Sequence, residues 1–70
     1  MKKFTYTNQY GYKCFINLDE VVSYYIVNAT YGTVLKVLFK NNNNYSEFLF
    51  NEKYAKDDIA KLEKLILENK

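Results

Sequence analysis

The sequence lacks histidine, arginine, tryptophan and proline, and it contains only one cysteine and two glycines. The single cysteine, Cys14, excludes an intrachain disulfide, and without histidine it cannot complete a structural or catalytic zinc site. No histidine is present to act as a base toward a cysteine or serine nucleophile. We therefore expect no metal, no cofactor and no catalytic residues, and we predict that the chain is not an enzyme.

Carboxylates do not change this expectation. The two acidic pairs, Asp19-Glu20 and Asp57-Asp58, are adjacent in sequence, so their side chains diverge instead of converging on one bond. Loop polarity and helix capping explain both pairs.

The excess of positive over negative charge is also small. Ten lysines and eight acidic residues give a net charge of +2 with no basic block. Arginine is the preferred side chain for gripping phosphate and guanine, and its absence weakens the case for nucleic acid. No apolar run is long enough to cross a bilayer, and one free thiol suits a reducing compartment. We expect a cytoplasmic protein without a membrane partner.

The 70 residues predict a single domain, 1–70. A core of this size rarely supplies more than about 3–5 kcal/mol unaided. Without a disulfide or a metal, we expect good packing or self-association to supply the remaining stability. The eight tyrosines and five phenylalanines favour the first and are compatible with the second.

Period-two alternation predicts a sheet over residues 3–50. The expected strands are 3–8, 12–18, 21–28, 33–40 and 45–50. Turns are expected at 8–11 and 29–32, which each end in glycine, and the asparagine run 41–44 predicts a longer connection.

The third of these strands is ambiguous, because residues 21–28 form a nearly continuous apolar run. Such a run is typical of a strand buried on both faces, or of a strand that pairs with another chain. Alternatively, Leu18 to Val22 forms a helical turn capped by Asp19, and a shorter strand begins at Ser23.

The spacing of the apolar residues changes near the C-terminus, where it predicts a helix over residues 54–69. Ala55, Ile59, Leu62 and Ile66 form one stripe, which Leu65 broadens. Leu67 lies off this stripe. Asp57 and Lys61 have a favourable i,i+4 spacing for an ion pair. Asn51 or Asp57 is expected to cap the start of the helix.

The expected fold class is α+β: a single antiparallel sheet of about five strands with the amphipathic helix packed on one face. A helix of about 15 residues spans roughly 22 Å, so it can cover only one face. Either the sheet curls on itself, or its other face is a contact surface. Candidate binding residues are Tyr10, Tyr12, Tyr24, Tyr31 and Tyr45, with the lysines Lys13, Lys36 and Lys40. The alternative is that these tyrosines are ordinary half-buried strand residues.

Segments 16–24 (INLDEVVSY) and 35–40 (LKVLFK), followed by a strand and a terminal helix, resemble the latter part of bacterial PH-like domains. This resemblance implies a scaffold for binding. The short length and the Asn-, Lys- and Tyr-rich usage are also similar to small phage and mobile-element proteins of AT-rich bacteria. That class includes anti-CRISPR proteins, other stoichiometric inhibitors of host defence, and sequesterers of defence nucleotides.

Together these features favour a non-catalytic protein-binding module, a phage or mobile-element inhibitor of a host defence complex in the bacterial cytoplasm. We expect a larger protein as its partner and a homodimer as its own state. The alternative is a small nucleic-acid or nucleotide binder that uses tyrosine stacking and lysine contacts.

Overall fold

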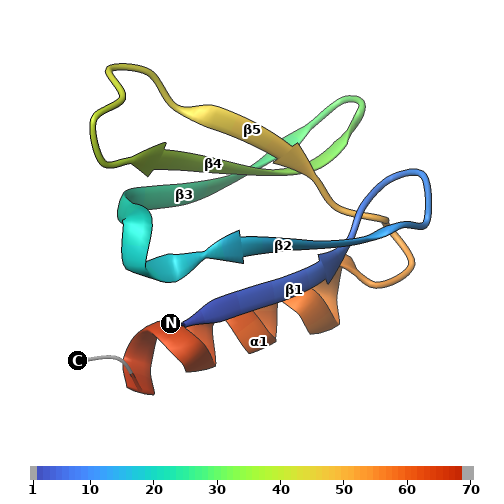
Figure 1. The fold of residues 1–70 in the computed structure, drawn as a ribbon. Coiled ribbons are helices and arrows are strands. Elements are labelled where there is room, and N and C mark those ends of the chain that lie inside the picture. The colour runs from blue at the N-terminus through green and yellow to red at the C-terminus, as the bar shows by residue number, and fades with distance from the viewer. Residues whose placement is uncertain (1, 69–70) are drawn as a thin grey trace.

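The computed structural model describes residues 2–68, which form five strands, a short 3-10 helix and a C-terminal α-helix (Figure 1). In chain order the elements are β1 (Lys3–Thr7), β2 (Lys13–Asn17), η1 (Leu18–Glu20), β3 (Val21–Ala29), β4 (Gly32–Phe39), β5 (Ser46–Leu49) and α1 (Ala55–Glu68). All strand pairs are antiparallel. The predicted α+β class and C-terminal helix are therefore confirmed.

The prediction of one five-stranded sheet is wrong, because the strands are divided into two sheets. β1 pairs with β2, and β3, β4 and β5 form a separate sheet in that order. The division occurs at η1, where the Asn17 side chain accepts a hydrogen bond from the Asp19 N–H at 3.0 Å and turns the chain out of β2. The predicted helical turn is thus present, but Asn17 caps it and β3 already begins at Val21.

The two sheets meet again at their other ends. Asn8, just after β1, forms an isolated antiparallel bridge with Phe50, just after β5. The Asn51 N–H then donates to the Thr7 carbonyl at 3.0 Å. Figure 1 shows the hairpin β1–β2 below the three-stranded sheet, with α1 beneath the hairpin.

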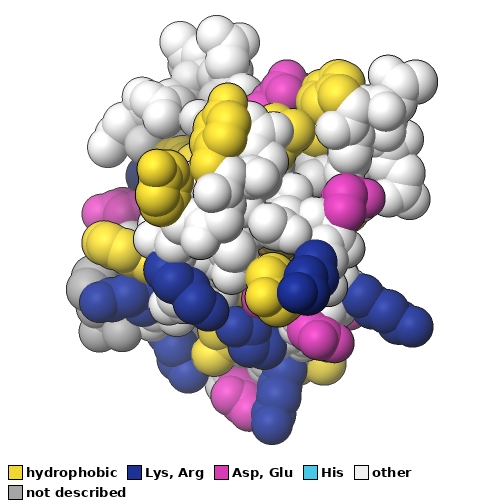
Figure 2. Space-filling view, turned by 90° about the vertical axis from the view of Figure 1, so that its right-hand side faces the viewer, with side chains coloured by type: hydrophobic (Ala, Val, Ile, Leu, Met, Phe, Trp, Pro, Cys, Tyr) yellow, Lys and Arg dark blue, Asp and Glu magenta, His cyan; other side chains and the backbone are white. Residues whose placement is uncertain are grey.

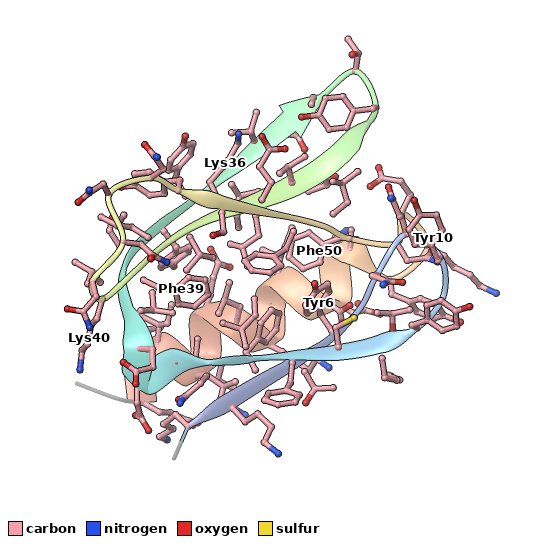
Figure 3. All side chains as sticks on the ribbon, turned by 45° about the horizontal axis from the view of Figure 1, so that its top comes forward. Tyr6, Tyr10, Lys36, Phe39, Lys40 and Phe50 are labelled. Atoms are coloured by element: carbon pink, nitrogen blue, oxygen red, sulfur yellow. The ribbon has the colours of Figure 1, made fainter. Side chains whose placement is uncertain are left out.

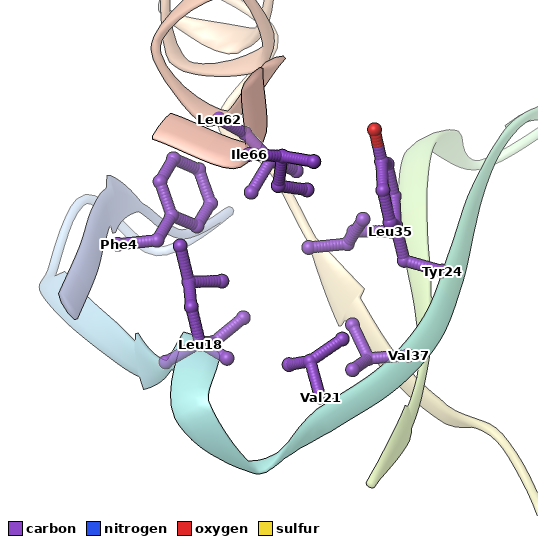
Figure 4. A pocket seen from close by; sticks show the side chains of 9 residues that line it. Phe4, Leu18, Val21, Tyr24, Leu35, Val37, Leu62 and Ile66 are labelled. Carbon is purple, nitrogen blue, oxygen red and sulfur yellow. The ribbon is translucent and has the colours of Figure 1, made fainter. Parts of the chain in front are cut away.

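The core lies between the inner faces of the two sheets and α1. Its buried members are Phe4, Tyr6, Ile16, Leu18, Leu35, Val37, Phe50, Ala55 and Leu62. The Tyr6 ring packs edge-on against Phe50, with the ring centroids 5.6 Å apart. A small cavity remains among Phe4, Leu35, Leu62 and their neighbours (Figure 4). The space in it that the centre of a water molecule could occupy is about 10 Å³. This cavity therefore has no room for a ligand larger than water.

The helix confirms the predicted stripe. Ala55 and Leu62 are buried, and Ile59, Leu65 and Ile66 pack against the core, whereas Leu67 is exposed. The helix begins one residue later than predicted, and its predicted last residue, Asn69, lies outside the described residues.

The prediction that residues 21–28 form a strand buried on both faces is wrong. β3 is an edge strand of its sheet, and none of its nine residues is fully buried. By contrast, Val34, Leu35 and Val37 of the central strand β4 are all buried. The alternative, that this strand pairs with another chain, stays a prediction.

Candidate functional site

The surface with the most unusual composition is the outer face of the three-stranded sheet. The strand register places Tyr25, Lys36 and Glu47 side by side across β3, β4 and β5. The next outward row is Val27, Val34 and Leu49. We call this surface the tyrosine face; it consists of Tyr25, Val27, Tyr31, Val34, Lys36, Leu38, Tyr45, Glu47 and Leu49.

The centre of the tyrosine face is apolar. Val34 is completely buried although it does not belong to the core cluster between the sheets and the helix. Its strand neighbours Val27 and Leu49 are half-buried. Val34 is therefore buried outside the core cluster, beside the half-buried Val27 and Leu49 of its neighbouring strands.

Three tyrosines surround this apolar centre with much of their surface in solvent. Tyr31, Tyr25 and Tyr45 are 60%, 46% and 41% exposed. The rings of Tyr25 and Tyr45 pack edge-on with centroids 5.1 Å apart. The Tyr45 hydroxyl donates to Ser23 Oγ at 3.2 Å. These contacts hold the rings in place, so that binding a partner would freeze little additional side-chain motion.

The charges of the tyrosine face cancel. Lys36 Nζ lies 2.6 Å from Glu47 Oε2, and the Tyr31 hydroxyl donates to the other oxygen of Glu47 at 3.3 Å. The hydrogen bond from Lys36 lowers the pKa of Glu47 and raises that of Lys36 itself. Both groups therefore stay ionised at neutral pH, and Lys36 is already paired with a carboxylate.

The structure divides the predicted binding residues among separate regions. Tyr31, Tyr45 and Lys36 meet on the tyrosine face. Tyr24 lies on the opposite side of β3, half-buried, where it lines the core cavity (Figure 4). Lys40 is exposed just after β4, at the other end of the molecule from Tyr10 (Figure 3).

Tyr10, Tyr12 and Lys13 form a second exposed group at the β1–β2 turn. The Asn8 side-chain oxygen accepts from the N–H groups of both tyrosines, at 3.0 and 2.9 Å, and so fixes this turn. Gly11 between them takes a positive φ of 87°, which an L side chain rarely adopts. This turn therefore carries two exposed aromatic residues that do not belong to the tyrosine face.

Sequence reasoning left the aliphatic members of the tyrosine face, and also Tyr25 and Glu47, out of the candidate residues. Tyr25 was passed over in favour of Tyr24, and Glu47 was not considered as the partner of Lys36. The alternation of Val34, Lys36 and Leu38 in β4 does mark the outward row, but residues 21–28 have no polar alternation that would extend it to β3.

Lysines gather elsewhere. Figure 2 shows them over the lower half of the molecule, where α1 and the β1–β2 hairpin lie in Figure 1. In residues 2–68 no group of three Asp, Glu or Cys side chains is arranged to hold a metal ion. No helix in this part of the chain is long and apolar enough to cross a membrane.

Comparison with protein-family models, with curated proteins and with solved structures finds no match to this chain. The geometry of the tyrosine face is therefore the basis for a functional assignment.

Proposed function

We propose that this chain is a non-catalytic binding module that attaches to a larger protein through the tyrosine face. One observation carries the proposal: the partly exposed rings of Tyr25, Tyr31 and Tyr45 lie on the outward face of the three-stranded sheet, around the apolar row Val27, Val34 and Leu49. Single exposed apolar residues are ordinary on protein surfaces, but contiguous apolar patches mark interaction sites.

The chemistry of the face favours a protein over a nucleic acid. Tyrosine is enriched among the residues that dominate binding energy, and interface cores are depleted in charge. The only charged side chains of the face, Lys36 and Glu47, neutralise each other. A phosphate backbone would find no free cation on this surface, whereas an apolar protein patch would meet Tyr31 and Tyr45 directly.

The partner class follows from the resemblance in composition to small phage and mobile-element proteins. We propose that the larger partner is a host defence complex in the bacterial cytoplasm and that the chain inhibits it by stoichiometric binding. This mode of action requires a surface and an affinity, and it needs no catalytic group.

The experiment uses the chain as immobilised bait in a bacterial lysate that contains such defence complexes. The test variant is Tyr31→Ser with Tyr45→Ser, which removes two rings of the face and leaves β3 unchanged. The matched control is Tyr10→Ser with Tyr54→Ser, because both of these tyrosines are exposed and lie outside the face. Circular dichroism checks that all three proteins are folded.

We expect wild type and control to capture the same partner in a stoichiometric ratio, and the test variant to lose it. Equal capture by the test variant would exclude the tyrosine face as the site. Raising the salt concentration from about 0.15 M to about 1 M should leave capture nearly unchanged, because screening weakens only exposed charge pairs.

A second candidate function, single-stranded nucleic-acid binding, is supported by the lysines in the lower half of Figure 2 and by Tyr10, Tyr12 and Lys13 at the adjoining turn. It predicts binding of a labelled single-stranded oligonucleotide that weakens steeply with salt. It also predicts loss of that binding on Tyr10→Ser with Tyr12→Ser, and no effect of Tyr31→Ser with Tyr45→Ser. Absence of binding at low salt would end this candidate.

A further inference from the structure

β3 has a free edge from Ser23 onward, while at its start the Val21 N–H donates to the Leu18 carbonyl. It is the longest strand, with nine residues, and within the described chain it pairs only with β4. An edge strand presents unpaired N–H and C=O groups, which form a template for pairing with a further strand.

The other strands that end a sheet are protected by devices that β3 lacks. β2 has five residues and carries the exposed Lys13. β5 has four residues, carries Glu47, and is followed by the bridge from Phe50 to β1. Short length and charged side chains are the usual means by which proteins block edge pairing.

β1 is covered along its second edge by the helix. Asp58 Oδ2 accepts from the Thr7 N–H at 3.0 Å, and Lys61 Nζ donates to the Thr5 carbonyl at 3.2 Å. Polar side chains of α1 thus take the place of a neighbouring strand. No comparable contact to β3 exists among the hydrogen bonds of the described residues.

The composition of β3 favours pairing instead of preventing it. Its sequence, VVSYYIVNA, contains no charged residue and no proline. Although most of it is apolar, none of it is fully buried, and Val22 is 61% exposed. A β-bulge between Val21 and Ser23 interrupts the ladder at one end. The regular segment that remains is 23–29.

We propose that the free edge of β3 pairs with β3 of a second copy of this chain, in an antiparallel arrangement about a two-fold axis. Segment 23–29 is symmetric in length about Ile26, so the axis passes beside this residue. Tyr25 of each copy then lies opposite Val27 of the other, an aromatic and β-branched pair of the kind that stabilises antiparallel strands.

A second copy fits this edge for two physical reasons. Because the strand is uncharged, two copies meet without like-charge repulsion although each chain carries a net charge of +2. In addition, a 70-residue domain without a disulfide has a core of marginal size. Pairing through β3 satisfies backbone groups that the monomer leaves to solvent.

The product would be one six-stranded sheet with both tyrosine faces on the same side, because a two-fold axis perpendicular to the sheet keeps equivalent faces together. Pairing consumes the only long unprotected edge that residues 2–68 present, so assembly stops at two copies. The inference does not depend on the proposed function, since it concerns the edge of β3, and the bait experiment concerns Tyr31 and Tyr45.

The test combines sedimentation equilibrium with amide hydrogen exchange on the full chain, at concentrations from about 1 µM to about 1 mM. One strand pair is smaller than a standard interface, so we expect a dissociation constant on the order of 10 µM. In the monomer, alternate amides of segment 23–29 point to solvent and exchange quickly. In the dimer, we expect these same amides to become protected as concentration rises.

The variant Val22→Lys with Asn28→Lys adds charge at two exposed positions of β3. We expect it to weaken dimerisation about tenfold or more while the chain stays folded. The control, Gln9→Lys with Thr30→Lys, adds the same charge at exposed turn positions outside the strands.

Three results would overturn the proposal: a monomer at every concentration, a dimer in which the alternate amides of segment 23–29 still exchange quickly, or an assembly larger than two copies. Equal weakening by the control variant would also overturn it, because net charge and not the β3 edge would then govern association. Hydrogen exchange on the wild type decides the matter even if a variant fails to fold.

Discussion

The carboxylate of Asp58 accepts a hydrogen bond from the backbone N–H of Thr7 at 3.0 Å, and both residues are about 5% exposed. Asp58 Oδ1 also lies 3.3 Å from Lys61 Nζ. Helix and hairpin are therefore joined by a buried charge-assisted hydrogen bond in addition to apolar packing.

We expect Asp58→Ala to lower the free energy of unfolding by about 2 kcal/mol, because it leaves the buried Thr7 N–H without an acceptor. Asp58→Asn keeps an acceptor oxygen and should lose less. Urea denaturation gives the values. The control is Asp57→Ala, which changes an exposed residue of the same helical turn and should shift stability by less than about 0.5 kcal/mol. Equal effects at the two positions would contradict this role for Asp58.

The stability of the fold should fall in strong base because of Tyr6. Burial, with a smaller contribution from the neighbouring Cys14 thiol, raises the pKa of Tyr6 from 10.0 to about 12. Between these values the unfolded chain releases the phenol proton before the folded chain does, so stability decreases as pH rises. The shift corresponds to up to about 3 kcal/mol.

Tyr6→Phe cannot ionise and isolates this effect from the other titrating groups. Urea denaturation of wild type and variant at pH values from about 9 to about 12 should give two curves whose difference changes within this window. Parallel curves would show that Tyr6 titrates alike in the folded and unfolded chain.

The ion pair on the tyrosine face should be visible by titration. Because Lys36 holds the pKa of Glu47 below its ordinary value, the Glu47 carboxyl resonance should titrate at a lower pH in the wild type than in the variant Lys36→Met. The stabilisation from this shift is present above the ordinary pKa and is lost as pH falls through the lowered one. Lys36→Met should raise the Glu47 midpoint toward its ordinary value; an unchanged midpoint would show that the pair does not persist in solution.

Two phenylalanines on neighbouring strands test the assignment of inner and outer faces. Phe4 of β1 is fully buried, while Phe15 of β2 is 60% exposed with Lys3 Nζ 4.7 Å from its ring centre. We expect Phe4→Ala to cost about 3–5 kcal/mol and to unfold much of the protein. Phe15→Ala should cost less than about 1 kcal/mol, as measured by thermal unfolding. Similar losses at both positions would mean that Phe15 also has a buried role.

Much of the local structure could be predicted because side-chain alternation determines which residues share a face. Phe4 and Tyr6 alternate with Thr5 in the sequence, and the structure places their two rings together in the core. The asparagine run likewise predicted the connection between β4 and β5, in which Asn41 has a φ of 67°.

The division into two sheets could not be predicted, because alternation assigns faces and says nothing about which strands are neighbours. The turn at Asn17 that separates β2 from β3 depends on one side-chain hydrogen bond, to the Asp19 N–H. The choice between Tyr24 and Tyr25 as the outward residue failed for a related reason: where apolar residues are continuous, the sequence does not indicate which of them face the core.

An ion pair between Lys61 and an acidic residue of the helix was predicted, but its partner was wrong. The i,i+4 rule pairs Lys61 with Asp57, but in the structure Lys61 lies beside Asp58 and reaches the Thr5 carbonyl. Tertiary contacts decided the partner, since Asp58 is the acidic residue that points toward β1.

The hydrogen bond between Thr7 and Asp58 joins residues that are 51 positions apart. During synthesis the ribosome releases β1 well before the helix that seals its second edge. The N-terminal hairpin therefore has one side open until the first turns of α1 have been synthesised, and the domain can close only once Asp58 and Lys61 are available.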